Sequence, residues 1–263
     1  MPRLALNPWS AAIGEPVPGI RRIAPDRQAQ WLDLGVRDFL AHPLIGLAYG
    51  LSFAGFGWLL TIGLARLGMG SLILPLAGGF LLVAPLAAAG LYEVSRQRGR
   101  GQGATLRATL AAVRRNGQVA DLGLVLLLIF FVWLQVALLL FALFYGSRPP
   151  ALNAFVDQVV LAPQGALFLT VGTALGGALA ALAFALSVVA MPMLLDREVS
   201  AITAMRASLA AVWNNRLAMI GWAATLATLG AIGLVCLFVG LAVTLPIAAH
   251  ASWHAYRDLV ARD

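Results

Sequence analysis

Long apolar runs, separated by shorter polar segments, dominate the pattern along this chain. The three apolar blocks cover residues 44–92, 122–195 and 217–250, and the segments between them are rich in arginine. Each block is longer than the roughly 20 residues with which a helix crosses a bilayer once. The pattern therefore predicts an all-α protein, a polytopic transmembrane helix bundle.

Turn residues divide the first two blocks into four helices. In the first block, Arg66 and the glycines at 68 and 70 predict a tight turn. In the second block, the residues Gly-Ser-Arg-Pro-Pro that follow Tyr145 end one helix before the next begins. The predicted helices cover about 44–65, 71–92, 121–145 and 166–194.

The third block allows either one long helix or two short ones. A single helix over 217–250 would be about 50 Å long, whereas the hydrocarbon core is about 30 Å thick. A break near Gly240 gives two short helices that fit. Five spans would place Arg257 and Arg262 outside, which remains an alternative.

Charge placement favours six spans with both termini in the cytoplasm. In that arrangement every arginine except Arg66 and Arg148 lies inside, as positive-inside orientation expects. The sequence thus predicts a transmembrane domain over 31–263, built as three hairpins that are each preceded by an amphipathic interfacial helix. The hairpins cover about 44–92, 121–195 and 217–256.

The first 30 residues are predicted to form a flexible tail. They lack the apolar core of a signal peptide and contain several prolines. These prolines stand at positions 2, 8, 16, 18 and 25.

An internal repeat precedes the second and third hairpins. Residues 106–116 (LRATLAAVRRN) align with residues 205–215 (MRASLAAVWNN), and a fainter copy begins at Val36. Leu106, Leu110 and Val113 fall on one face of a helix, with the arginines off that face. Each copy is therefore predicted to be an amphipathic helix, and repeats of this kind occur both in transporters and in scaffolds.

Two positions for these helices remain open. They lie in the cytoplasmic interface with their arginines on anionic lipid headgroups, or they pack against the ends of their own bundle. The arginines predicted to contact headgroups are Arg107, Arg114, Arg115 and Arg206.

The second helix of each hairpin contains a proline near its cytoplasmic end. Pro85, Pro192 and Pro246 are predicted to kink their helices, because proline frees a backbone carbonyl. Such kinks either open a cavity between helices or only curve them so that the bundle closes.

His250 and His254 are the most conspicuous candidates for binding chemistry. Their i, i+4 spacing places both imidazoles on one face of a helix, where they share a metal or serve as axial ligands to haem. The alternative is anchoring at the membrane interface, together with Trp253 and Tyr256 in an aromatic belt. No third ligand is evident, so the sequence predicts no cofactor.

Asp121 and Gln135 are candidates for a polar site inside the membrane. Asp121 opens the third predicted helix, where its carboxylate also complements the helix dipole. Gln135 lies within that helix and is expected to form an interhelical hydrogen bond.

Composition narrows the function further. The chain is 61% hydrophobic and 11% charged, compared with about a quarter charged residues in a soluble domain. Its single cysteine, Cys236, excludes an internal disulfide and a thiolate metal cluster. No nucleophile–base arrangement or phosphate-cradling loop is evident, so we expect a protein that is not an enzyme and does not bind nucleic acid.

Several short motifs are distributed along the chain. They are Trp31-Leu-Asp-Leu-Gly, Asp38, Tyr49-Gly50, Pro85 with Leu91-Tyr-Glu-Val-Ser-Arg, Pro192-Met-Leu-Leu-Asp-Arg, and Pro246 with His250-Ala-Ser-Trp-His-Ala-Tyr-Arg-Asp. Together these motifs resemble a bacterial integral-membrane family, the domain-of-unknown-function 2189 family. The resemblance covers about residues 20–260, and the C-terminal motif is its most specific part. It implies a helical inner-membrane protein and carries no established activity or catalytic residue.

These observations predict an accessory, assembly or interaction protein of a bacterial inner membrane. Its expected partners are the bilayer, anionic lipids and another membrane complex. The alternative is a small transporter or channel, which the repeat and the prolines favour.

Overall fold

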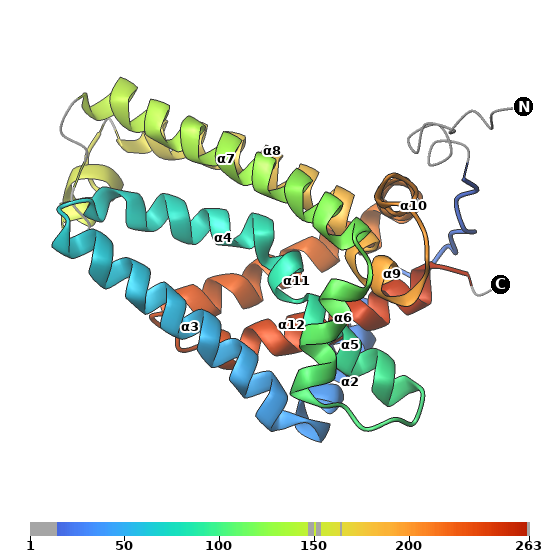
Figure 1. Cartoon of the computed structure of the whole chain (residues 1–263). Helices are drawn as coiled ribbons and strands as arrows, with labels where there is room; N and C mark the ends of the chain where they lie inside the picture. The colour runs from blue at the N-terminus through green and yellow to red at the C-terminus, as the bar shows by residue number, and fades with distance from the viewer. Residues whose placement is uncertain (1–14, 147–149, 151–153, 164, 262–263) are drawn as a thin grey trace, which may run out of the picture.

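The computed structural model is a helical bundle in which long and short helices occupy different ends (Figure 1). It describes residues 15–261 apart from 147–149, 151–153 and 164, and the side chain of Arg115 is also outside the described part. Short helices and both described ends of the chain gather at one end, which we call the arginine-rich end. The turns around residues 67–72 and 154–163 lie at the opposite, far end.

The described segments form the following elements in chain order. The helices are α2 (Gln28–Ala41), α3 (Pro43–Arg66), α4 (Ile73–Ala87), α5 (Ala89–Gly99), α6 (Leu106–Arg115), α7 (Gln118–Tyr145), α8 (Gly165–Ser187), α9 (Ala190–Asp196), α10 (Ala201–Asn214), α11 (Arg216–Val235) and α12 (Leu241–Leu259), with a 3₁₀ turn η1 (Gly70–Leu72) and a π-helical turn η3 (Val156–Val160) at the far end.

Five helical stretches are long and apolar enough to cross a membrane. This confirms a multi-pass helical membrane protein. The predicted sixth span, α12, is not among them. The five stretches are Pro43–Arg66, Gly70–Gly99, Gln118–Tyr145, Gly165–Asp196 and Arg216–Val235.

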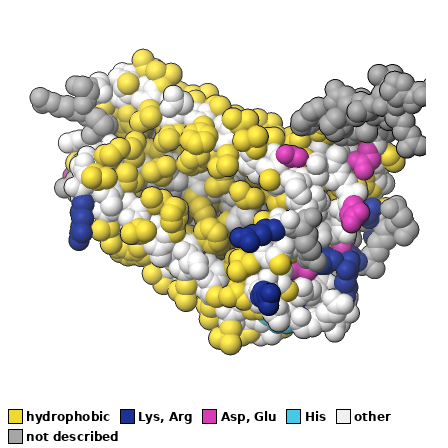
Figure 2. Space-filling view, viewed as in Figure 1, with side chains coloured by type: hydrophobic (Ala, Val, Ile, Leu, Met, Phe, Trp, Pro, Cys, Tyr) yellow, Lys and Arg dark blue, Asp and Glu magenta, His cyan; other side chains and the backbone are white. Residues whose placement is uncertain are grey.

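Side chains of different character separate along the bundle. In Figure 2, apolar side chains cover the part formed by the long helices, while most charged side chains on this face lie at the arginine-rich end. The largest cluster of buried residues also extends into that end, where the Trp31 and Trp222 rings pack edge to face with centroids 5.4 Å apart. Outward-facing leucines of α7, such as Leu128 and Leu139, are by contrast exposed, as expected for a lipid-facing helix.

Two of the three predicted kinks coincide with breaks between helices. The chain leaves α4 for α5 at Ala88, three residues after Pro85, and leaves α8 for α9 just before Pro192. Pro246 instead lies inside α12, which continues past it. Since Pro246 has no N–H group, it leaves the carbonyl of Ala242 without its helical partner.

Helix α12 packs closely against α3 through glycines. A Cβ atom built on Gly50 would lie 2.5 Å from the Cα of Ala242 and 2.6 Å from its carbonyl oxygen. Gly46 and Gly57 instead face side chains: Gly46 lies against Phe39 and, less closely, Pro246, and Gly57 lies against the Phe238 ring. The glycines of α3 therefore let the two backbones approach. At Gly50, the backbone of α3 covers the carbonyl of Ala242 that Pro246 leaves free.

The turn between α11 and α12 stops short of the far end of the bundle. Phe238, within this turn, lies against Gly57, which precedes the last residue of α3 by nine positions. Nine residues of helix correspond to about 13 Å. Leu237 and Phe238 have φ angles of 52° and 66°, so two consecutive left-handed residues reverse the chain abruptly. The predicted break near Gly240 is confirmed.

The described part of the predicted tail is docked. Arg21 donates its backbone N–H to the carbonyl of Leu259 at 2.8 Å, and Ile20 pairs with Val260 in an antiparallel bridge. The Arg27 guanidinium holds the Asp258 carboxylate at 2.8 and 3.0 Å. Residues 15–27 thus differ from the flexible tail that was expected, because backbone pairing and an ion pair fix them to the end of α12. Residues 1–14 lie outside the described part.

Candidate functional site

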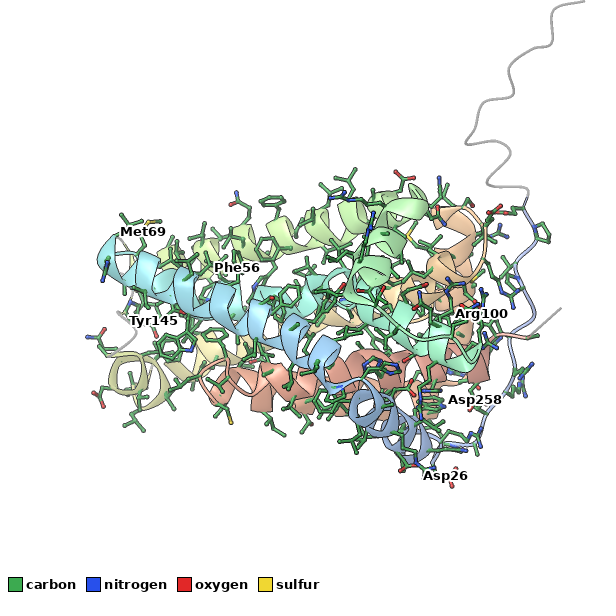
Figure 3. All side chains as sticks on the ribbon, turned by 60° about the horizontal axis from the view of Figure 1, so that its bottom comes forward. Asp26, Phe56, Met69, Arg100, Tyr145 and Asp258 are labelled. Atoms are coloured by element: carbon green, nitrogen blue, oxygen red, sulfur yellow. The ribbon has the colours of Figure 1, made fainter. Side chains whose placement is uncertain are left out.

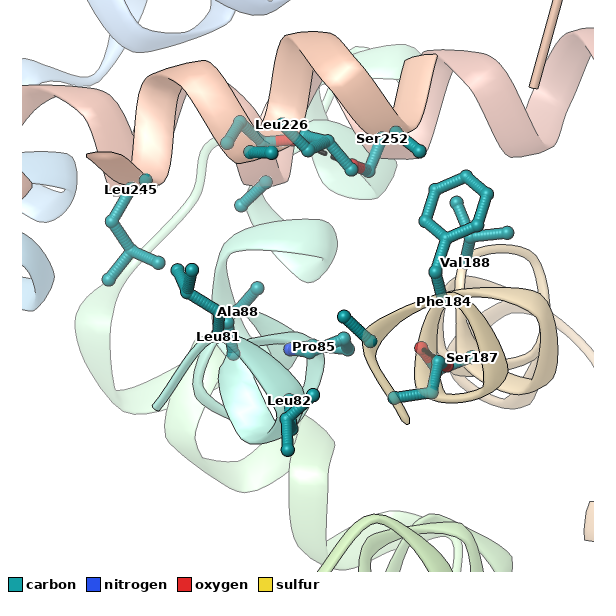
Figure 4. A pocket seen from close by; sticks show the side chains of 18 of the residues that line it. Leu81, Leu82, Pro85, Ala88, Phe184, Ser187, Val188, Leu226, Leu245 and Ser252 are labelled. Carbon is teal, nitrogen blue, oxygen red and sulfur yellow. Dashed lines mark hydrogen bonds between the residues drawn. The ribbon is translucent and has the colours of Figure 1, made fainter. Parts of the chain in front are cut away.

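A cavity of about 410 Å³ lies between α4, α8 and the α11–α12 pair, at the depth of the long helices. Figure 4 shows Leu81, Leu82 and Pro85 on one side, with Phe184 and Leu226 facing them from α8 and α11. Small residues, chiefly alanine and glycine, make up much of the remaining wall. The small residues of the wall are Ala84, Ala88, Gly177, Ala180, Ala181, Ala183, Ala223, Ala224, Ala227, Gly230, Ala248 and Ala249.

The polar groups of this cavity are hydroxyls that already have partners in most cases. The hydroxyl of Ser187 donates to the carbonyl of Ala183 at 2.6 Å, and that of Ser252 donates to Ala248 at 2.8 Å. The Tyr92 hydroxyl forms a hydrogen bond with Ser252. Its lining contains no charged side chain among the described residues. The hydroxyl of Thr244 is the exception, because it is buried in the lining without a hydrogen-bond partner among the described residues. Such walls suit a hydrocarbon chain, because they offer an ion no charge and few polar ligands.

Neither predicted intramembrane polar residue lines this cavity. Asp121 lies in the first turn of α7 and is exposed, which agrees with the helix-dipole interpretation. Gln135 is also exposed, on the outer surface of α7. The predicted interhelical hydrogen bond of Gln135 is not formed with any described helix, because its side chain faces outward.

Of the three predicted kink residues, only Pro85 lines the membrane-level cavity. At Pro85 the predicted kink therefore borders a cavity between helices: α4 ends two residues later, and α5 continues in a new direction. Pro192 and Pro246 are both buried in packed regions. For them the structure agrees with curvature.

Both predicted ligand histidines belong to a hydrogen-bonded network at the arginine-rich end. Nε2 of His254 lies 2.9 Å from Oδ2 of Asp38, and Nδ1 of His250 lies 2.8 Å from the hydroxyl of Ser95. The Arg98 guanidinium forms an ion pair with the same Asp38 carboxylate. Asp38 is only 2% exposed and His250 is fully buried. The network therefore joins α2, α5 and α12.

Burial and hydrogen bonding set the protonation states in this network. Burial alone would raise the pKa of Asp38, but hydrogen bonds from His254, Ser95 and Arg98 outweigh it and lower the pKa to about 2. Burial lowers the pKa of His250 to about 4, against a smaller opposing effect of Asp38. Near neutral pH, Asp38 is therefore ionised and His250 is neutral.

This arrangement does not favour the predicted metal or haem site. His250 and His254 each have a protein partner, and no group of three or more His, Cys, Asp or Glu in the described part of the chain is placed to hold a metal ion. The aromatic-belt interpretation also differs from the structure. Trp253 and Tyr256 are 3% and 1% exposed, because they pack between helices and do not face lipid headgroups.

The repeat segments are helices that expose their leucines. Leu110 of α6 and Leu209 of α10 are exposed, whereas the buried faces consist of small residues such as Ala112 and Ala211. Arg107, Arg114 and Arg206 are exposed as well, and the side chain of Arg115 lies outside the described part. Each helix thus packs on the bundle with one face and exposes leucine and arginine side chains on the other.

Sequence reasoning gave no role to Ser95 or Asp38 in this network. Asp38 is the charged residue on the buried face of α2, which it shares with Trp31, Gly35 and Phe39. A carboxylate on an apolar helical face indicates a buried partner, but the sequence alone does not identify that partner. Ser95 and His250 are 155 positions apart, so nothing in the local pattern connects them.

Fold and cavities together define a polytopic helical membrane protein. The model of a family described as a predicted integral membrane protein, DUF2189, matches residues 73–196. This match confirms the family resemblance over α4 to α9, and it does not extend to the C-terminal motif from Pro246 onward. No curated protein and no solved structure matches the chain.

Proposed function

We propose that this protein is a non-enzymatic accessory protein of a membrane complex that holds the apolar chain of a lipid-like molecule. The membrane-level cavity between α4, α8 and the α11–α12 pair carries this proposal. Its volume of about 410 Å³ falls within the usual range of ligand pockets, about 300–1,000 Å³. A void of that size lined by alanine, leucine and phenylalanine is most stable when an acyl or isoprenoid chain fills it.

The expected location is a bacterial inner membrane, with the arginine-rich end in the cytoplasm. Ion-paired and exposed arginines at that end support this orientation, since arginine-rich segments stay on the inner side. The exposed leucines and arginines of α6 and α10 support contact with anionic lipids on the same side.

Filling the cavity tests the proposal. Gly177 of α8 lines it, and a Cβ atom there would meet nothing within 4 Å, so Gly177→Phe should fold and occupy the ligand space. Gly55 of α3 is exposed and equally open, which makes Gly55→Phe a matched control. Mass spectrometry of the protein purified in mild detergent would count bound lipid and identify co-purifying proteins.

We expect wild type and Gly55→Phe to retain about one tightly bound lipid per chain and Gly177→Phe to lose most of it. Equal lipid content in all three proteins would contradict the proposal. A stoichiometric partner protein would support the accessory role.

Transport of the same kind of molecule is the second candidate. Pro85 in the cavity wall favours it, because helix breaks at proline are where membrane helices bend. Reconstituted vesicles would distinguish the two roles. Faster movement of a labelled lipid between leaflets, abolished by Gly177→Phe, would indicate transport.

A further inference from the structure

A second cavity, of about 620 Å³, lies at the arginine-rich end and has a different chemistry. Four guanidinium groups line it, together with His254, Ser95 and Asp38 of the network. The arginines come from the end of α5 and from α12. They are Arg96, Arg98, Arg100 and Arg257.

Two of these arginines are satisfied by a carboxylate of their own. Arg96 grips the buried Glu93 with two bonds of 2.6 and 2.7 Å, and Arg98 pairs with Asp38. The other two have to share one acceptor. Asp196 lies 3.5 Å from Arg100 and 3.4 Å from Arg257.

These shared contacts are long for ion pairs. A formed charge-assisted bond between nitrogen and oxygen measures about 2.7–2.9 Å. Asp196 also accepts a hydrogen bond of 2.9 Å from the Tyr256 hydroxyl, so its capacity is divided three ways. The contacts of Arg100 and Arg257 with Asp196 are therefore weak, and both residues line the cavity.

Arg257 is held in place by more than the loose pair with Asp196. Its guanidinium lies over the Trp253 ring, 5.8 Å from the ring centroid. Arg100 caps the C-terminal end of α5, and Gly101, with a φ angle of 70°, then turns the chain away from the cavity. Both cations thus have a defined position on packed helices.

We propose that Arg100 and Arg257, with Arg98 beside them, bind a phosphoryl group. Four guanidinium charges face three carboxylates here, which leaves a net positive site. The planar forks of arginine match the oxygens of phosphate in pairs, and an anionic phosphoryl group balances the surplus positive charge. This site is separate from the apolar cavity and does not rest on the function proposed above.

The phosphoryl group belongs either to a lipid headgroup or to a soluble phosphate compound, and two assays distinguish these sources. In the first, full-length protein in nanodiscs of phosphatidylcholine is titrated with inorganic pyrophosphate in a calorimeter. In the second, nanodiscs contain phosphatidylglycerol, and the lipid retained by the repurified protein is counted by mass spectrometry.

Arg100→Gln is the test variant, because this side chain is half exposed and its loss leaves the buried ion pairs intact. Arg37→Gln is the control. It removes a more exposed arginine, 65% against 50%, that pairs with Asp33 at 2.9 Å on α2, outside the cavity. A single symmetric elution peak for both variants establishes that they are folded.

We expect binding in one assay, a loss of at least about tenfold in Arg100→Gln, and less than about twofold change in Arg37→Gln. The assay that responds identifies the source. Absence of binding in both assays, or equal effects of the two substitutions, would overturn the site.

An independent observation concerns the α11–α12 hairpin. Its turn is apolar and exposed: Val235, Leu237 and Val239 are 80%, 63% and 59% exposed, and Cys236 is exposed too. A turn in water normally carries polar residues. Residues 217–249 contain no charged residue at all.

Both ends of this hairpin are held at the arginine-rich end. The Gln28 side chain donates to the carbonyl of Ala218 at 2.8 Å, and the Trp31 indole donates to Asp258 at 3.1 Å. The first turns of α11 and the last turns of α12 therefore pack on α2. Only the middle of the hairpin is left to enter the membrane, and it ends about 13 Å short of the end of α3.

We infer that α11 and α12 form a re-entrant hairpin that enters and leaves the membrane on the arginine-rich side. The backbone of the turn fits an apolar medium, since Cys236, Val239 and Leu241 donate their N–H groups to carbonyls within the turn or the end of α11. Four spans and one re-entrant hairpin then replace the predicted six spans, and both termini stay on one side.

The single native cysteine tests this topology without any substitution. We expect a membrane-impermeant maleimide to leave Cys236 unlabelled in spheroplasts and in inverted vesicles, and to label it fully in denaturing detergent. As a control, Met69→Cys in a Cys236→Ser background should react from one side, because Met69 lies in the far-end turn (Figure 3). Labelling of native Cys236 from either side would overturn the inference.

Discussion

At the scale of single residues, a buried pair of titratable groups couples the arginine-rich end to pH. Asp38 and His250 lie in the same network, and each has a lowered pKa for a different reason. Hydrogen bonds stabilise the charged form of Asp38, whereas burial disfavours the charged form of His250. Both groups therefore stabilise the folded protein more at neutral than at acidic pH.

The pH dependence should appear in two windows. His250 has a pKa of about 4 in the folded protein and about 6.5 when unfolded, so its contribution is full above pH 6.5 and is lost as the pH falls towards 4. Asp38 adds a second loss between about pH 4 and 2. In detergent, the melting temperature should fall across both windows. The first loss corresponds to up to about 3 kcal/mol.

Replacing His250 separates the two contributions. His250→Gln keeps a partner for Ser95 and cannot take up a proton, so it should flatten the curve between pH 6.5 and 4 while leaving the loss below pH 4. A wild-type slope in this variant would show that another group causes the first window.

At the scale of elements, contact between α3 and α12 depends on missing side chains. Gly50 lies against the backbone of Ala242, where no flexible side chain exists that moves aside. The freed carbonyl that Pro246 creates is covered at the same point. Gly50 of α3 and Pro246 of α12 thus form one contact: the glycine lets α3 cover the carbonyl that the proline leaves free. Neither residue predicts this contact from the sequence of its own helix.

Two alanine substitutions on α3 should have opposite effects. Gly50→Ala should lower the free energy of unfolding by about 1–3 kcal/mol, because its Cβ atom would overlap the α12 backbone. Gly55→Ala, with nothing within 4 Å, should be neutral or raise it by up to about 1 kcal/mol. Thermal unfolding of both variants in the same detergent checks the difference. Equal stability would show that α3 and α12 approach less closely.

At the scale of the whole molecule, the sequence predicted the helices and breaks that depend on the local pattern of apolar and turn residues. Apolar length and turn residues placed α3, α7 and the break near Gly240 within a few residues, because one helix needs about 20 apolar residues to cross a membrane. Contacts between distant segments were not predictable. Arg27 and Asp258 are 231 positions apart, and the depth of the third hairpin depends on which residues of α3 it meets.

The candidate functional residues were likewise predictable only where they depend on local spacing. The candidate histidines were found by their spacing, but their partners Ser95 and Asp38 come from other helices and change what the imidazoles do. The membrane-level cavity arises where α4, α8 and the hairpin diverge, and no single stretch of sequence encodes it.

The uncharged turn of the α11–α12 hairpin also affects how the chain is made. In the proposed orientation, insertion of the first two hairpins carries Arg66 and Arg148 across the bilayer, whereas a re-entrant third hairpin translocates no charge. A nascent chain that ends before Leu217 would already have its final orientation. On this topology, insertion of α11 and α12 is a late step from the side of synthesis, and it completes the wall of the cavity that α4 and α8 form with this hairpin.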